Sequence, residues 1–333
     1  MAQGAGNDLE NEGETERWRD GNIPGAVEEA IDLLGGIKAV TRGKNKIMLK
    51  PNLTADNPTF TTKPVVVESL AKMMLNAGKE VFIGEGSAAA FSFNASETEI
   101  FRTRKREILD KMQKHVFDVL GYSEMAKSLN IPLINLHSGP IVEVPLKNRF
   151  AAKLVKIHKS LTGNDLLCSV PMMKTHTLAT VTLAMKNLIG LYPGMEYYAV
   201  RSWLHDRAAE AGSQGVAYEV IDMNNAVSTG LSVIDASIAM EGNGPSDGTI
   251  FDMGLIIAGT SPLATDMIGT LLMGFELDEV PAIVLAHTSG MLPALLDDIE
   301  IRGLSIDECK RKFVKPIIYK WIDINKFWGV KEL

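Results

Sequence analysis

A strand, a helix and a second strand follow one another between residues 46 and 84, and this succession constrains the fold most. Lys46–Lys50 and Glu80–Gly84 are short, mainly apolar runs of strand type. The stretch between them has Pro64 near its start and Gly78 after its end, which are start and stop signals of a helix. Two strands joined by a crossover helix lie parallel, with ligand sites in the loops beyond their carboxyl ends.

The rest of the chain extends this pattern. Further helices are expected over residues 23–34, 97–129 with a break at Gly121, and 220–227, and after Ser261-Pro262; further strands are expected over 166–170, 231–236 and 254–258, with three short strand-like runs between 133 and 161. The sequence therefore predicts an α/β fold, with a mostly parallel, doubly wound sheet flanked by helices and a small inserted β-hairpin or subdomain. Residues 1–20 are expected to be a polar, disordered tail, and residues 21–333 a single α/β domain.

Composition excludes several classes of protein. A net charge of -7 argues against a sequence-independent nucleic-acid binder, which needs a basic face. No apolar run reaches the ~18 residues of a membrane helix, and the acidic start lacks a signal pattern, so no membrane contact and a cytoplasmic location are expected. With only Cys168 and Cys309, the chain cannot by itself hold an iron-sulfur cluster or a cysteine-only zinc site.

The segment after the strand at 166–170 carries the most suggestive chemistry. If Thr175 to Leu188 is helical, then Thr175, Thr182 and Lys186 share a polar face opposite an apolar stripe. The free amides at the start of such a helix, with Lys174, His176 and Thr177 beside them, favour an anion such as a phosphate or a carboxylate. The alternative is that these lysines are solvated and the histidine satisfies a hydrogen bond in the core.

Polar residues at the ends of other strands are expected to complete this site. The glycine loop 241–248 allows backbone amides to approach a ligand, although a simple solvent turn is equally consistent with it. The candidate catalytic residues are His176, Lys174 and Glu85, and the candidate substrate-binding residues are Lys50, Asn52, Thr175, Thr177, Thr182, Lys186, Asn187, Gly242 and Gly244.

A divalent metal is a weaker hypothesis. Its candidate ligands are His176, His205 and Asp222, but no short spacing of the His-Glu-x-x-His kind brings them together. The glycine loops match neither the phosphate-binding loop nor the dinucleotide fingerprint, so neither ATP nor NAD is assigned.

Seven short motifs together resemble the domain of unknown function 362 family over about residues 22 to 275. They are Lys50-Pro-Asn52, Thr61-Thr-Lys-Pro64, Gly84-Glu-Gly-Ser87, Pro171-Met-Met-Lys-Thr-His176, Val181-Thr-Leu-Ala-Met-Lys-Asn-Leu-Ile-Gly190, Glu241-Gly-Asn-Gly-Pro245 and Ser261-Pro-Leu-Ala-Thr-Asp266. The resemblance implies a redox setting for some relatives, which carry fused iron-sulfur modules, but no common reaction. The family usually opens with a strand that residues 1–20 do not offer, so one sheet edge is expected to be absent, altered or covered by another subunit.

Two functional hypotheses follow. The first is an enzyme that binds a small anionic metabolite, uses lysine and histidine for acid-base chemistry and is assisted by a divalent metal. The second is a non-catalytic cofactor-binding or redox accessory protein that works with an iron-sulfur partner. A structural module whose polar motifs are only caps and turns is the third, plainer reading, and it predicts that Lys50, His176, Lys186 and Glu241 lie far apart.

Overall fold

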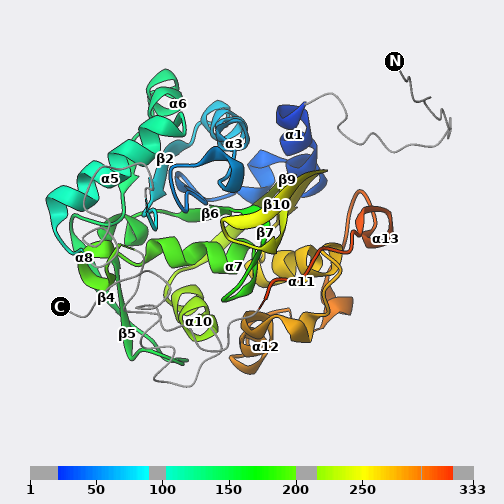
Figure 1. Ribbon diagram of the computed structural model, residues 1–333. Coiled ribbons are helices and arrows are strands. Elements are labelled where there is room, and N and C mark those ends of the chain that lie inside the picture. Colours follow the sequence, from blue (N-terminus) through cyan, green and yellow to red (C-terminus); the bar gives the residue numbers. More distant parts are fainter. Residues whose placement is uncertain (1–21, 90–102, 200–215, 294, 318–333) are drawn as a thin grey trace, which may run out of the picture.

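The computed structural model describes residues 22–89, 103–199, 216–293 and 295–317 (Figure 1). The predicted polar tail, the start of the expected helix over 97–129 and the metal candidate His205 lie outside these residues.

The described chain is built around one mixed sheet. Its strands run in the order β3 (Leu133–Asn135), β2 (Glu80–Glu85), β1 (Lys46–Pro51), β6 (Leu166–Val170), β9 (Thr229–Asn243), β7 (Met172–His176) and β8 (Thr180–Thr182), with β10 (Asp247–Gly259) also paired to β9. The pairs from β3 to β7 are parallel, whereas β8 and β10 pair antiparallel with β7 and β9. β4 (Ile141–Pro145) and β5 (Leu154–His158) form a separate two-stranded sheet.

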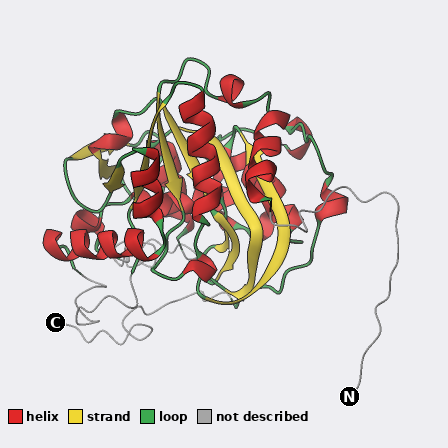
Figure 2. Cartoon of the chain, turned by 90° about the horizontal axis from the view of Figure 1, so that it is seen from above, coloured by secondary structure: helices red, strands yellow, loops and turns green. Residues whose placement is uncertain are grey.

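Helices cover both faces of the sheet (Figure 2). The described α-helices are α1 (Ile23–Leu33), α2 (Ile37–Val40), α3 (Pro64–Asn76), α5 (Arg106–Val119), α6 (Tyr122–Leu129), α7 (Ala184–Asn187), α8 (Gly194–Tyr197), α10 (Ala217–Ala226), α11 (Pro262–Leu272), α12 (Pro281–Thr288) and α13 (Ile306–Cys309). The described 3-10 turns are η1 (Pro58–Phe60), η2 (Lys159–Thr162), η3 (Leu188–Leu191), η4 (Leu277–Glu279) and η5 (Leu296–Asp298).

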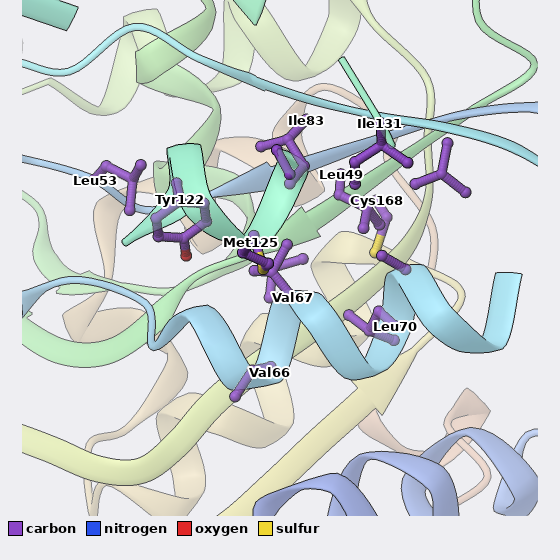
Figure 3. Packing of buried hydrophobic residues seen from close by; sticks show 14 of the residues in the cluster. Leu49, Leu53, Val66, Val67, Leu70, Ile83, Tyr122, Met125, Ile131 and Cys168 are labelled. Carbon is purple, nitrogen blue, oxygen red and sulfur yellow. The ribbon is translucent and has the colours of Figure 1, made fainter. Parts of the chain in front are cut away.

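Side chains of the central strands point alternately to the two faces of the sheet, and each face has its own apolar core. In β1, Ile47 and Leu49 pack with α1, α3, α5 and α6, whereas Met48 packs on the opposite face with residues of η3 and β5. Successive side chains of a strand point to opposite faces, so a strand buried on both faces reads as a continuous apolar run. Figure 3 shows the first of these cores, with Val67 and Leu70 of α3 turned toward the strands. The predicted α/β class, parallel sheet and inserted hairpin are confirmed.

The predicted helix from Thr175 to Leu188 is wrong. The chain instead continues β7 to His176, turns, and returns as β8, and only Ala184–Asn187 is helical. The run is rich in β-branched threonine and valine, which favour strands, and the turn back into β8 uses a positive φ of 65° at Thr180. The apolar spacing that suggested a helix comes from residues in two strands and a short helix.

None of the described helices is long and apolar enough to cross a membrane.

Candidate functional site

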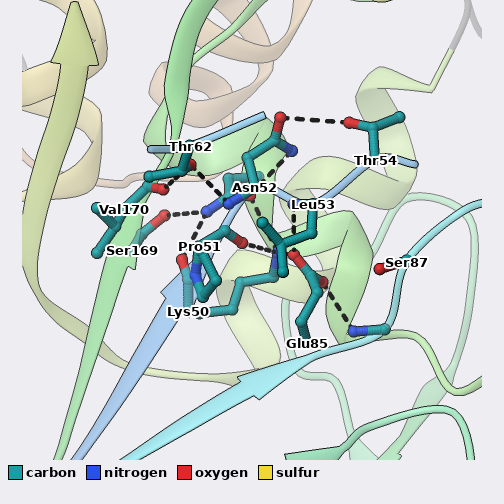
Figure 4. A network of polar contacts seen from close by, with 12 residues as sticks. Lys50, Pro51, Asn52, Leu53, Thr54, Thr62, Glu85, Ser87, Ser169 and Val170 are labelled. Atoms are coloured by element: carbon teal, nitrogen blue, oxygen red, sulfur yellow. Dashed lines mark hydrogen bonds and ion pairs between the residues drawn. The ribbon is translucent and has the colours of Figure 1, made fainter. Parts of the chain in front are cut away.

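The carboxyl end of β1 places a buried lysine among three acceptors (Figure 4). Lys50 is 1 % exposed, and its Nζ donates to the Pro51 carbonyl at 2.8 Å, to Glu85 Oε2 at 2.8 Å and to Asn187 Oδ1 at 3.0 Å. An ammonium has three N–H donors, so each of the three has an acceptor. Lys50 is therefore held as a paired cation.

Glu85, at the end of β2, holds both the lysine and two loops. Its carboxylate also accepts hydrogen bonds from the backbone amides of Leu53 and Gly86, at 3.0 and 2.8 Å. Gly190 passes so close that a Cβ there would lie 2.4 Å from Glu85 Oε1 and 2.7 Å from Lys50 Nζ. The close approach of this backbone requires a residue without a side chain.

Asn187 joins α7 to this strand end. Its Oδ1 accepts from Lys50 and from Asn52 Nδ2, while its Nδ2 donates to the Lys50 carbonyl and to Ser169 Oγ, both at 3.0 Å. The start of α7 is fixed separately by Asp266, whose carboxylate accepts from the amides of Ala184 and Met185. Burial raises the pKa of Asp266 to about 7.

Lys174 of β7 is a second buried lysine, with a different set of partners. Its Nζ donates to the Phe60 carbonyl at 2.6 Å and to Thr54 Oγ1 at 3.2 Å, and it is fully buried. Burial, followed by the charges of Lys186 and Lys50, lowers its pKa to about 7. Thr54 in turn donates to Asn52, which connects this lysine to the Lys50 network.

The pairing of β7 with β8 places the hydroxyl of Thr182 on the same face as Lys174. Thr182 of β8 is the register partner of Lys174, so both side chains project from the same face. Thr182 is 2 % exposed, and its Oγ1 has no hydrogen-bond partner in the described structure. Buried hydroxyls normally have partners, so an unpartnered one next to a lysine indicates a place for a ligand.

These residues define what we call the lysine site. It consists of Lys50, Asn52, Glu85, Lys174, Thr182, Lys186 and Asn187. Lys186 is half-buried on α7, close enough to Lys174 for its charge to lower that pKa. Of the four residues that a purely structural module predicts to be scattered, Lys50 and Lys186 both lie near Lys174.

Four other predicted residues form a contact between β7 and the β9–β10 hairpin. The Thr175 hydroxyl donates to the Gly242 carbonyl at 2.7 Å, and the Thr177 amide donates to the Gly244 carbonyl at 2.9 Å. The amides of Gly242 and Gly244 donate to the carbonyls of Val314 and Gly242. The backbone amides of Gly242 and Gly244, which the sequence suggested for ligand binding, are therefore hydrogen-bonded within the chain.

His176 lies two residues beyond Lys174, on the same side of β7 by alternation. Its Nδ1 accepts the amide of Leu178 at 3.0 Å, which leaves Nε2 as the protonated nitrogen of the neutral ring. The ring therefore helps to form the turn between β7 and β8.

Of the three predicted metal ligands, the structure describes His176 and Asp222, whereas His205 lies outside the described residues. Asp222 accepts the backbone amides of Phe150, Ala151 and Ala152 at 2.7 to 2.8 Å, so it anchors the loop after β4. Among the described residues there is no group of three or more histidine, cysteine, aspartate and glutamate side chains placed to hold a metal.

Three participants were not among the predicted site residues: Thr54, Phe60 and Gly190. Thr54 lies two residues after the Lys50-Pro-Asn52 motif, and Gly190 is the last residue of the motif that begins at Val181. Their positions in the sequence could therefore have indicated them. Phe60 contributes its carbonyl, and every residue has one, so no residue type could have indicated it.

Comparisons with known proteins found similarities of three kinds. The sequence model described as "Domain of unknown function (DUF362)" matches residues 47–270. A thylakoid-associated protein of Synechocystis sp. is 22% identical over 282 residues, covering 84% of this chain and 78% of that protein. Among solved structures, the lactate racemase apoprotein from Thermoanaerobacterium thermosaccharolyticum aligns with a TM-score of 0.44 and 13% identity. The alignment covers 72% of this chain and 52% of that one, so this chain spans about half the length of that protein.

Proposed function

The chain belongs to the DUF362 family, whose description names no reaction, and from that premise we propose that it is an enzyme acting on a small anionic substrate at the lysine site. The observation that carries the proposal is that two other lysines and one carboxylate lie near the buried amine of Lys174. Glu85 pairs with Lys50 at 2.8 Å, while Lys174 is influenced by the charges of both Lys50 and Lys186.

Electrostatics favour an anionic guest. Two like charges near a buried amine disfavour its protonation, and together with burial they lower the pKa of Lys174 below its ordinary value. A phosphate or carboxylate beside Lys174 and Lys186 would offset this repulsion. Binding should then raise the pKa of Lys174, and the protein should take up a proton as the anion binds.

The same residues suit acid-base chemistry. A group whose pKa lies near the working pH exchanges protons readily in both directions. Lys174 meets this condition, with a pKa of about 7. Glu85 holds Lys50 and the neighbouring loops, and His176 stands next on the Lys174 face as a further proton carrier.

Calorimetric titration of the full chain with acetate and with inorganic phosphate tests the proposal. Repeating it in two buffers of different ionisation enthalpy reports the proton uptake. Lys174→Met and Lys186→Met should each weaken binding roughly tenfold or more, because a charge-assisted hydrogen bond contributes about 1.5–3 kcal/mol. Lys72→Met, on the surface of α3 with 56% of its side chain exposed, is the matched control.

Unchanged binding in both site variants, or no binding of either anion to the wild-type chain, would overturn the proposal. Circular dichroism separates lost binding from lost folding. If Lys174→Met does not fold, the variant at the half-buried Lys186 still tests whether the anion binds here.

The remaining hypotheses need experiments of their own. A redox accessory role with an iron-sulfur partner predicts a coloured protein that co-purifies with this chain, and elemental analysis decides on a divalent metal. Cell fractionation compares a cytoplasmic location with the thylakoid association that the Synechocystis relative's name gives for that protein.

We also propose that residues 21–333 form one domain, which predicts a single cooperative unfolding transition.

A further inference from the structure

We propose that Lys174 is a catalytic lysine that forms an imine with the carbonyl group of a small oxo-carboxylate. The inference rests on the proposed function, because the carboxylate is the anion that the lysine site would bind. To the proposed function it adds the class of substrate, a small oxo-carboxylate, and a covalent bond between that substrate and Lys174.

Hydrogen-bond geometry favours a neutral amine at Lys174. Its Nζ has two acceptors, the Phe60 carbonyl and Thr54 Oγ1. Thr54 donates its own hydrogen to Asn52 Oδ1, so its oxygen is an acceptor toward the lysine. A neutral amine has two N–H donors and one lone pair, whereas an ammonium would have a third N–H without an acceptor among the described residues. The lone pair of Lys174 is therefore left for a substrate.

Lys50, in contrast, has no lone pair available for a substrate. Its three donors face three acceptors, one of them the Glu85 carboxylate, so its nitrogen is held as an ammonium without a lone pair. An amine that is buried beside other cations is the kind of lysine that attacks carbonyl carbon, because it is unprotonated at neutral pH. A pKa of about 7 instead of 10.5 increases the unprotonated fraction at pH 7 on the order of a thousandfold.

Thr182 supplies the second requirement of the step. Its buried, unpartnered hydroxyl lies opposite Lys174 across the β7–β8 pair. Cβ atoms of such paired residues are roughly 4.5–5.5 Å apart, so the two side chains start side by side on one face. In the proposed step, Thr182 would donate to the carbonyl oxygen of the substrate as negative charge develops on it.

The reaction starts from the fraction of Lys174 that is unprotonated when the carboxylate is bound, and it balances without an oxidant or a reductant. The lone pair of Nζ forms a bond to the carbonyl carbon, and the C=O π bond breaks to give a carbinolamine. Both hydrogens of the amine end on the departing oxygen, which leaves as water, and a C=N bond remains. In sum, a carbonyl compound and a primary amine give an imine and water.

The η1 turn lies between Lys174 and a small surface cavity. Phe60 is 4 % exposed, with its ring centroid 5.7 Å from Lys174 Nζ. Its neighbours Thr59 and Thr61 line a surface cavity of about 180 Å³ together with Met172, two residues before Lys174 on β7. The η1 turn thus contacts both the amine and the cavity. Lys174 does not itself line this cavity, and the positive charge of Lys186 near the amine favours a substrate with a carboxylate.

Reductive trapping tests the proposal directly. The full chain is incubated at pH 7 with sodium cyanoborohydride and either pyruvate or glyoxylate, and the product is mapped by peptide mass spectrometry. The expected result is one reduced adduct on Lys174, formed before any adduct on the exposed lysines. Lys174→Arg should abolish the adduct while circular dichroism stays unchanged, and Thr182→Val should slow its formation about fivefold or more, the loss of one hydrogen bond of about 1 kcal/mol. Lys72→Met should leave it unchanged.

Two results would overturn the inference: adducts spread over surface lysines without preference, or none at all under conditions that modify a model amine. Acetate, which has no electrophilic carbonyl, separates this failure from that of the proposed function. If acetate binds and no adduct forms, anion binding stands and the imine is wrong; if acetate does not bind, the anion site is wrong as well.

Discussion

Two buried lysines in this protein illustrate two ways of placing an amine inside a folded chain. Lys50, where β1 ends, meets three acceptors, including the Glu85 carboxylate. Lys174, on β7, meets two uncharged acceptors and lies near two further cations. Burying a charge is costly unless it is paired, and an unpaired group responds by losing its charge. The first region is therefore suited to holding the fold together, and the second to binding and proton transfer.

The largest expected effect comes from removing the paired cation. Lys50→Met should lower the free energy of unfolding by about 3–5 kcal/mol, because it leaves the Glu85 carboxylate buried without its counter-ion. Chemical denaturation measures the loss. The double variant Lys50→Met with Glu85→Gln should recover most of it, since both charges are then absent. A single variant as stable as wild type would show that the pair does not stabilise the fold.

The pH dependence of stability distinguishes the second lysine. The unfolded chain keeps the Lys174 proton up to the ordinary pKa of 10.5, whereas the folded chain releases it near pH 7. Between these values the unfolded state binds more protons, so this residue makes the free energy of unfolding rise by roughly 1 kcal/mol per pH unit, and that contribution is lost as pH falls toward 7. Lys174→Met should remove this slope, and Lys72→Met should keep it. Equal slopes in wild type and Lys174→Met would show that the lysine stays charged.

A substitution at Gly190 tests how closely the chain packs around the Lys50–Glu85 pair. Gly190→Ala would place a methyl group 2.4 Å from Glu85 Oε1 and 2.7 Å from Lys50 Nζ, so the pair must shift. We expect a loss of about 1–3 kcal/mol in thermal or chemical unfolding. Gly163→Ala is the control, because its nearest neighbour would be 3.9 Å away, and it should change stability by less than about 0.5 kcal/mol. Similar losses in both variants would show that packing against the Lys50–Glu85 pair is not the cause.

The smallest expected effect concerns two threonines near the second lysine. Thr182 has a buried hydroxyl without a partner in the described structure, so Thr182→Val should leave stability unchanged or raise it by up to about 1 kcal/mol. Thr175→Val should cost about 1 kcal/mol, because the Thr175 hydroxyl donates to the Gly242 carbonyl at 2.7 Å. Calorimetric melting of the two variants resolves the difference in sign. A clear loss in Thr182→Val would mean that its hydroxyl already has a role in the fold.

The sequence was informative about the ends of strands. The strands over 46–50, 80–84 and 166–170 and the helix after Pro64 were predicted because periodicity, proline and glycine act within a few residues. In a parallel sheet the carboxyl ends of strands share one edge, so Lys50 and Glu85 were expected near each other and are hydrogen-bonded.

The sequence was misleading between Thr175 and Leu188. A spacing that fits a helix also arises when two short strands and a turn follow one another, and the sheet that decides between them includes β9, more than 40 residues later. Thr182 was placed near Lys174 for the wrong reason: the two residues meet across an antiparallel pair and not along one face of a helix.

By itself, the sequence determined most of the local elements, the α/β class with its mostly parallel sheet and the kinds of polar residue that follow the strands. Only the tertiary structure decided which lysine is paired with a carboxylate and which is buried between uncharged acceptors. That distinction depends on acceptors far away in the chain, Asn187 for Lys50 and the Phe60 carbonyl for Lys174, at separations of 137 and 114 residues. The charge state of a buried group is set by every dipole and ion around it, and those neighbours exist only once the chain has folded.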